Sequence, residues 1–134
     1  MLVKQLKIFF LILFVFSLSA LAQIKVEAGN ISYFQVEYKK NIRAGEEVDI
    51  KLMAKDPFDN DVSDFSGKVK LKINDEDKTV SISNGIGIFK FYSNKVGKYN
   101  FKIYLDNTVF KIKDSYTSGL LNEFSVYVLN GSIG

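Results

Sequence analysis

Apolar and polar residues alternate along most of the chain after residue 23. In residues 46–55, for example, Val48, Ile50, Leu52 and Ala54 fall on one face, and mostly charged residues lie between them. Alternation with a period of two is typical of a β-strand that has one face on a core and the other in water. The pattern predicts seven strands, near residues 32–39, 46–55, 67–74, 78–83, 86–92, 98–105 and 108–113.

The breaks between these runs contain residues that favour turns. The stretch 56–61 (DPFDND) holds the only proline of the chain, and residues 84–87 contain an Asn-Gly pair, which favours a tight hairpin. Seven short strands in about 80 residues are the spacing of an immunoglobulin-like β-sandwich. We therefore predict an all-β, immunoglobulin-like sandwich of about seven strands, without the Cys pair and Trp of antibody domains.

Tyr99 lies at the start of the sixth predicted strand. Sandwiches of this kind often place a tyrosine there whose hydroxyl bonds back to the chain a few residues upstream. An ordinary core aromatic explains the residue equally well. The sequence leaves both interpretations open.

The N-terminus reads as a helical secretory signal peptide over residues 1–22. Lys4 and Lys7 precede a short apolar run, and small residues follow it, which predicts cleavage between Ala22 and Gln23. The apolar run is shorter than the roughly 20 residues that a membrane-spanning helix needs, although an uncleaved anchor is the competing interpretation. We expect a mature chain that begins with a short segment, residues 23–30, and has no membrane span. We expect this chain to be secreted, periplasmic or on the surface of a bacterial cell.

Composition excludes several functions. Without residues 1–22 the chain has 16 Lys+Arg against 15 Asp+Glu, so it lacks the strong positive charge of a nucleic-acid-binding protein. It contains no His and no Cys, and therefore has no His- or Cys-based catalytic pair, no structural zinc site and no disulfide. We expect no enzyme activity and no cofactor.

One acidic turn has the residue types of a calcium site. Asp56, Asp59, Asn60 and Asp61 follow a predicted strand, and Asp64 lies close by. Calcium takes six to eight oxygen ligands, but the spacing here does not match a known calcium loop. We favour a polar turn whose side chains bond their own backbone, and expect no metal.

A set of turn and strand-start residues between 44 and 73 carries a resemblance. They are Ala44-Gly45, Ala54-Lys55-Asp56, Asn60 and Gly67. In this order they resemble the bacterial immunoglobulin-like modules of invasin- and intimin-type surface proteins. There, an Ala-Gly turn opens a strand that ends in Ala-x-Asp. A turn with Asn follows, and Gly opens the next strand. The family usually has Gly before that Asn, where this chain has Asp59.

The resemblance extends over residues 31–113. Gly97 and Tyr99 are similar to a later Gly-x-Tyr strand of these modules, and Phe34 and Val36 stand where their first strand begins. The matched positions specify shape and no chemistry. What the family implies is a rigid spacer whose partners are neighbouring immunoglobulin-like modules or another surface protein.

The end of the chain repeats its beginning, because Phe124 and Val126 echo Phe34 and Val36. Since seven strands complete a sandwich by residue 113, we interpret residues 114–121 as a linker. Residues 122–134 are then either an extra edge strand or the first strand of a truncated second module. The resemblance favours the second alternative.

We therefore expect a non-catalytic secreted or surface module that acts as a rigid spacer or in adhesion. The alternative is a secreted module that binds carbohydrate or protein. Such a module would need outward-facing aromatic side chains, and among the candidates Tyr104 falls on the outward phase of its strand. The other candidates are Tyr92, Tyr116 and Tyr127.

Overall fold

The computed structural model describes residues 31–131, which form nine strands and no helix. The strands are β1 (Tyr33–Glu37), β2 (Asn41–Arg43), β3 (Val48–Lys55), β4 (Gly67–Ile73), β5 (Glu76–Ile82), β6 (Ile86–Phe91), β7 (Gly97–Leu105), β8 (Thr108–Lys113) and β9 (Phe124–Leu129). Accordingly, this part of the chain contains no helix that is long and apolar enough to cross a membrane. The predicted signal peptide, its cleavage site at Ala22 and Gln23, and segment 23–30 lie outside the described residues.

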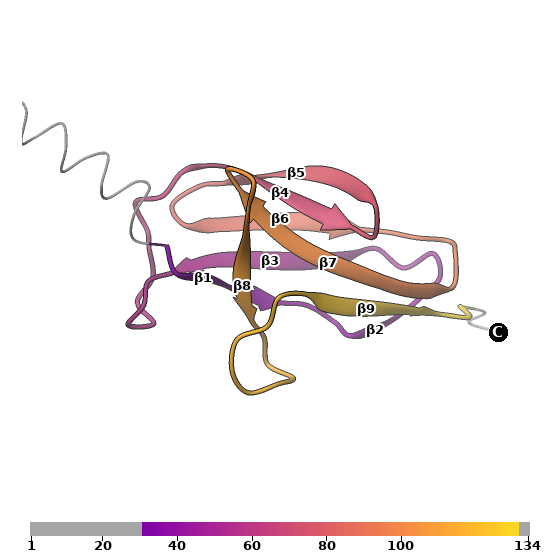
Figure 1. Ribbon diagram of the computed structural model, residues 1–134. Coiled ribbons are helices and arrows are strands. Elements are labelled where there is room, and N and C mark those ends of the chain that lie inside the picture. The colour runs from indigo at the N-terminus through magenta and orange to yellow at the C-terminus, as the bar shows by residue number, and fades with distance from the viewer. Residues whose placement is uncertain (1–30, 132–134) are drawn as a thin grey trace, which may run out of the picture.

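Two sheets pack face to face (Figure 1). In the first sheet the order is β8, β1, β3 and β6, in which β1 and β8 are parallel and the other pairs antiparallel. In the second sheet the order is β2, β9, β7, β4 and β5, in which only β2 and β9 are parallel. Strand β8 also pairs with the C-terminal end of β7, so it joins the two sheets along one side.

This arrangement is an immunoglobulin-like β-sandwich. Strands β3 and β6 pair in one sheet, while β4, β7 and β9 lie together in the other, as in the two sheets of that fold. The first two strands belong to different sheets, because β1 pairs with β3 in the first sheet and β2 pairs with β9 in the second. The predicted fold class is confirmed, with β2 and β9 in addition to the seven predicted strands.

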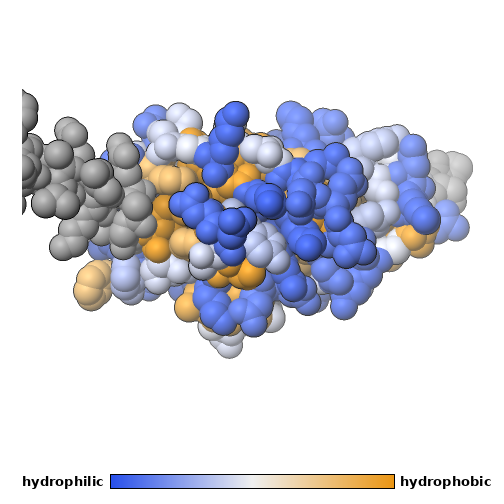
Figure 2. Space-filling view, turned by 45° about the horizontal axis from the view of Figure 1, so that its top comes forward, coloured by the Kyte–Doolittle hydropathy of each residue, from blue (hydrophilic) through white to orange (hydrophobic). Residues whose placement is uncertain are grey.

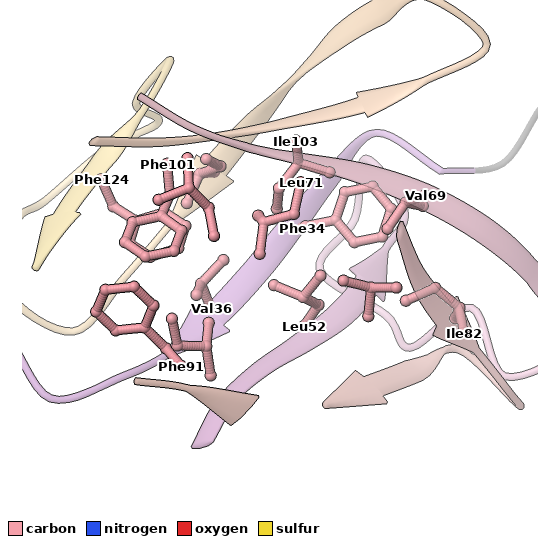
Figure 3. Packing of buried hydrophobic residues seen from close by; sticks show 14 of the residues in the cluster. Phe34, Val36, Leu52, Val69, Leu71, Ile82, Phe91, Phe101, Ile103 and Phe124 are labelled. Atoms are coloured by element: carbon pink, nitrogen blue, oxygen red, sulfur yellow. The ribbon is translucent and has the colours of Figure 1, made fainter. Parts of the chain in front are cut away.

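The core lies between the two sheets and consists of aliphatic and aromatic side chains. Figure 3 shows Phe34, Val36 and Leu52 of the first sheet facing side chains of the second. The facing residues include Leu71, Phe101, Ile103 and Phe124. Among the described residues no buried polar or charged side chain occurs, and no buried side-chain N or O lacks a partner. Burial of apolar surface therefore stabilises the domain without help from disulfides.

Strand β9 differs from both expectations for residues 122–134. It lies between β7 and β2, and pairs with β7 over five residues, from Phe101–Phe124 to Gly97–Val128. Its inward side chains Phe124, Val126 and Val128 are buried, with at most 3% of each residue exposed. Residues 124–129 are thus neither an edge strand nor the unpartnered start of a second module, because their apolar face completes the core of this sandwich.

The expected linker 114–121 is a loop inside the same domain. The carboxylate of Asp114 accepts a hydrogen bond from the Tyr38 hydroxyl at 2.6 Å, and two from Thr117. The Tyr116 hydroxyl donates to the Tyr38 carbonyl oxygen at 2.8 Å. These contacts fasten the loop to the bend between β1 and β2, which a flexible linker would not require.

Candidate functional site on the outer face of the second sheet

The turn residues that carried the family resemblance act as structural contacts. Ala44 and Gly45 connect β2 to β3, and their N–H groups donate to the carbonyl oxygens of Leu129 and Ser93, both at 2.9 Å. Gly45 has φ +88°, a conformation that glycine adopts without strain. Gly67 and Gly97 are the first residues of β4 and β7. This turn therefore ties β9 and the β6–β7 loop to the start of β3.

Tyr99 forms the hydrogen bond that one of its two interpretations requires. Its hydroxyl donates to the carbonyl oxygen of Lys95 at 2.7 Å, four residues upstream. The Ser93 hydroxyl lies 2.6 Å from the same oxygen, and Ser93 also accepts from the Lys95 N–H. The Tyr99 ring meets Phe91 edge-on in the core. Tyr99 thus fastens the β6–β7 loop to the sandwich.

The acidic turn has the geometry of a self-bonded polar turn. One oxygen of Asp56 accepts hydrogen bonds from the N–H groups of Phe58 at 2.8 Å and Asn60 at 2.9 Å. The bond from Asn60 is the main reason that the pKa of Asp56 lies below its ordinary value. Asp59 accepts from the Tyr33 hydroxyl, and Asp61 pairs with Lys55. Over residues 31–131, no group of three acidic side chains is placed to hold a metal ion.

A shallow groove crosses the outward face of the second sheet. One depression of about 390 Å³ is lined by Lys72, Asn74, Asp75, Asn100, Lys102, Tyr104 and Glu123. A second, of about 140 Å³, adjoins it and shares Lys72 and Tyr104. Figure 2 shows that the surface toward the tip of the β4–β5 hairpin is almost wholly hydrophilic. Tyr104, which the sequence placed on the outward phase, is the aromatic side chain that lines both depressions.

Two lysines face each other beside Tyr104. Lys72 of β4 and Lys102 of β7 are directly opposite in the antiparallel register. Neither lies within 4.0 Å of a carboxylate of the described chain, whereas Lys70 is 3.8 Å from Asp77. Like charges directly opposite across strands repel, which weakens the sheet. The pair thus presents two ammonium groups that an anionic or hydroxyl-bearing ligand would satisfy.

Neutral polar side chains hold the floor of the groove in place. The Oδ1 atom of Asn74 accepts from the Asn100 N–H at 2.9 Å, and the Asn74 N–H donates to the Asn100 carbonyl oxygen at 2.8 Å. The Ser125 hydroxyl donates to Oδ1 of Asn100 at 2.7 Å. This chain of contacts joins the β4–β5 turn to β7 and β9, so hydrogen bonds hold the floor of the groove in place.

The outward aromatic side chains do not form one flat platform. Tyr104 pairs with Lys70 near one end of β7, while Tyr127 stands opposite Lys98 at its other end. Six residues of strand separate these two positions along β7, which is about 20 Å. Tyr116, in the β8–β9 loop, packs on Tyr38. A saccharide could thus stack on one ring, Tyr104, and not on a row of rings.

Comparison with known proteins gives a similarity in structure and none in sequence family. No protein-family model and no curated protein matches the sequence. Among solved structures, the chain is similar to the CARDB domain of a Pyrococcus furiosus protein, crystallised in complex with di-metal ions. The sequence identity is 18%, the TM-score is 0.44, and the match covers 73% of this chain and 92% of that domain.

Proposed function

We propose that this protein is a non-catalytic, secreted or cell-surface module of a bacterial envelope protein, and that it acts as a rigid spacer. The observation that carries the proposal is the position of the two ends of the described chain. Strand β1 begins at one end of the sandwich and β9 finishes at the opposite end, with most strands running between them (Figure 1). A module of this shape extends a chain by its full length when it is repeated.

Three further features support a spacer. Three connections, the β2–β3 turn, the β6–β7 loop and the β8–β9 loop, are tied to the sandwich through Gly45, Tyr99 and Asp114. Ala44 and Gly45, two of the residues that resemble invasin- and intimin-type modules, stand at one of these tied turns. The surface depressions described above are shallow and polar, unlike the enclosed apolar pockets of most enzymes and small-molecule receptors.

The spacer role is tested by joining two copies of residues 31–131 directly and measuring small-angle X-ray scattering. We expect a rod with about twice the maximum dimension of the single module. A matched fusion with a flexible Gly-Ser linker of about 20 residues provides the control for free rotation. If the direct fusion scatters as a compact, folded-back particle, the spacer proposal is wrong.

Secretion is tested separately with the full chain of 134 residues in a bacterial host. We expect mature protein outside the cytoplasm whose first residue is Gln23. Retention of residues 1–22 in the membrane fraction would support the alternative of an uncleaved anchor.

A second candidate function is saccharide binding in the groove around Tyr104. The supporting observation is that two adjoining depressions share Tyr104 and the opposed Lys72. Affinity electrophoresis through gels that contain a neutral or a uronic-acid polysaccharide tests it. Retardation of the native chain that is lost in Tyr104→Ala, and kept in Tyr127→Ala, would support this function. Equal mobility of all three proteins in both gels would exclude it.

A further inference from the structure

Strand β6 leaves one edge of the first sheet open. It pairs with β3 on one side, and on its other side only the bridge to Ser83 is formed among the described residues. In this bridge Ile86 both donates to and accepts from the backbone of Ser83, at 3.1 and 2.9 Å. Because backbone groups alternate in direction along a strand, those of Ile88 and Lys90 point to the same open side. Four backbone donors and acceptors are thus available there.

Apolar side chains flank this open edge. On the outer face Ile86 is 45% exposed and Ile88 is 56% exposed. On the inner face Phe89 lines a groove of about 550 Å³, together with Ile73, Phe91 and Tyr99. Charged residues, namely Glu76, Lys78, Lys90 and Lys95, also line this groove. The groove separates this part of β6 from the β4–β5 hairpin. An edge with unpaired backbone and apolar side chains on both faces is a template for pairing with another strand.

The lysine that would normally protect such an edge is paired with carboxylates of its own module. A lysine on an edge strand discourages pairing with another chain because its charge resists burial. The ammonium group of Lys90, however, lies 3.0 Å from Asp49 and 4.0 Å from Glu47, on the side of β3. Its charge is therefore compensated within the module, and the edge stays open.

We propose that β6 pairs in antiparallel fashion with β6 of a second copy of this chain, in a register that places Phe89 opposite Phe89. Independently of the spacer role, the module would then associate side by side with another copy. In this register Ile88 of each copy stands opposite Lys90 of the other copy. These two symmetric pairs form hydrogen bonds with all four free backbone groups of each strand. The two Phe89 rings meet where the inner grooves join.

Other symmetric registers satisfy the edge less well. A register centred on Ile88 would place Lys90 opposite Ile86, whose backbone groups already bond to Ser83. A register centred on Lys90 would place two ammonium groups directly opposite each other, which is unfavourable. The edge is thus self-complementary in one register, and this complementarity argues for a second copy as the occupant.

The first test places a charge at position 88 and measures the oligomeric state. Sedimentation of residues 23–134 is followed at increasing protein concentration. We expect a concentration-dependent dimer in the native chain. Ile88→Lys should abolish it, because the new ammonium group would be buried beside Lys90 of the other copy without a carboxylate of its own, since Asp49 and Glu47 are already paired with Lys90. Ile88→Glu should retain dimerisation, because Glu meets the same lysine. If the native chain remains monomeric, or if both variants lose the dimer equally, the proposal fails. Circular dichroism verifies that each variant is folded.

The second test exploits the absence of cysteine from the chain. Residues directly opposite in a hydrogen-bonded pair have Cα atoms about 5.5 Å apart, which a disulfide can span. A mixture of Ile88→Cys and Lys90→Cys proteins should therefore form a disulfide-linked heterodimer under mild oxidation. Ile88→Cys alone should not, because the two positions are then diagonal, about 7–8 Å apart.

Variants Asp77→Cys and Thr79→Cys, on the outer strand β5 of the second sheet, form the control mixture. If the β6 mixture cross-links no faster than this control, association through β6 is wrong. If Ile88→Cys cross-links with itself in preference to Lys90→Cys, the proposed register is wrong.

Discussion

The ring of Phe101 lies parallel to the ring of Phe124, with centroids 4.8 Å apart and an angle of 8° between the planes. This contact joins β7 to β9 in the centre of the core, and Phe91 meets Phe101 edge-on beside it. The last strand thus shares the aromatic centre of the module with strands from both sheets.

Replacing Phe124 with Ala should reduce the free energy of unfolding by about 3–5 kcal/mol, because it leaves a cavity against Phe101. Leu129→Ala is the matched control, since Leu129 ends the same strand and is half exposed. Urea unfolding followed by circular dichroism measures both. If the two variants lose equally little stability, residues 124–129 do not belong to the cooperative unit.

Tyr99→Phe should lower the free energy of unfolding by about 1 kcal/mol, because the hydroxyl bond to the Lys95 carbonyl oxygen is lost while the ring stays. Tyr104→Phe provides the control, as the Tyr104 hydroxyl forms no hydrogen bond within the described chain. Equal stabilities for these two variants would show that the hydroxyl of Tyr99 contributes nothing.

Gly85→Ala should be far more costly than Gly119→Ala, although both glycines have positive φ, +80° and +86°. A Cβ atom at Gly85 would lie 2.3 Å from the carbonyl oxygen of Val62, whereas at Gly119 it meets nothing within 4 Å. We expect a loss of about 1 kcal/mol at Gly119 from backbone strain alone, and of roughly 3 kcal/mol at Gly85. If the melting temperature falls equally in both variants, the β5–β6 turn accommodates the added methyl group without extra cost.

The loop anchored by Asp114 should make stability depend on acidity. Burial opposes ionisation of this carboxyl, but hydrogen bonds from Tyr38, Thr117 and Tyr116 outweigh it and hold its pKa below the ordinary value. The carboxylate therefore stabilises the fold fully above pH 4, the region of its unfolded pKa, and this contribution disappears as the pH falls through the lower folded pKa.

Asp114→Asn should accordingly cost about 1–2 kcal/mol at pH 7, since charged hydrogen bonds are lost from a partly exposed site. The difference from the native chain should shrink as the pH falls below 4. Urea unfolding at several pH values measures it. A difference that stays constant from pH 7 to pH 2.5 would assign the effect to shape and not to charge.

The periodic pattern predicted most of the fold, because strands with one buried face alternate so regularly. It missed β2, since three residues with one buried side chain, Ile42, are too few to show a period. It also misjudged β9, because counting seven strands treated the sandwich as complete. Nothing local in the sequence indicates that β8 joins the two sheets, which left room for β9 beside β7.

In the candidate site, too, local alternation predicted some features, while others depend on which strands are neighbours. The outward phase of Tyr104 was evident from alternation, but the opposition of Lys72 and Lys102 depends on the register of two strands that are 30 residues apart. The contact between Asp114 and Tyr38 spans 76 residues and has no local signal. The open edge of β6 depends on which strands are neighbours, and periodicity does not report that.

The two parallel pairs of the sandwich have a mechanical consequence. Strands β2 and β9 run in the same direction, and are joined by backbone bonds such as the one from Tyr127 to Lys40 at 2.8 Å. Tension applied at residues 31 and 131 pulls these strands in opposite directions along their length, so it shears the bonds together and does not peel them one by one. We expect a force ramp on tandem modules to show high, uniform rupture peaks, and Tyr127→Pro, which removes this bond, to lower them. When a chain that contains this module is stretched, the β2–β9 pair would then be the part of the module that resists extension.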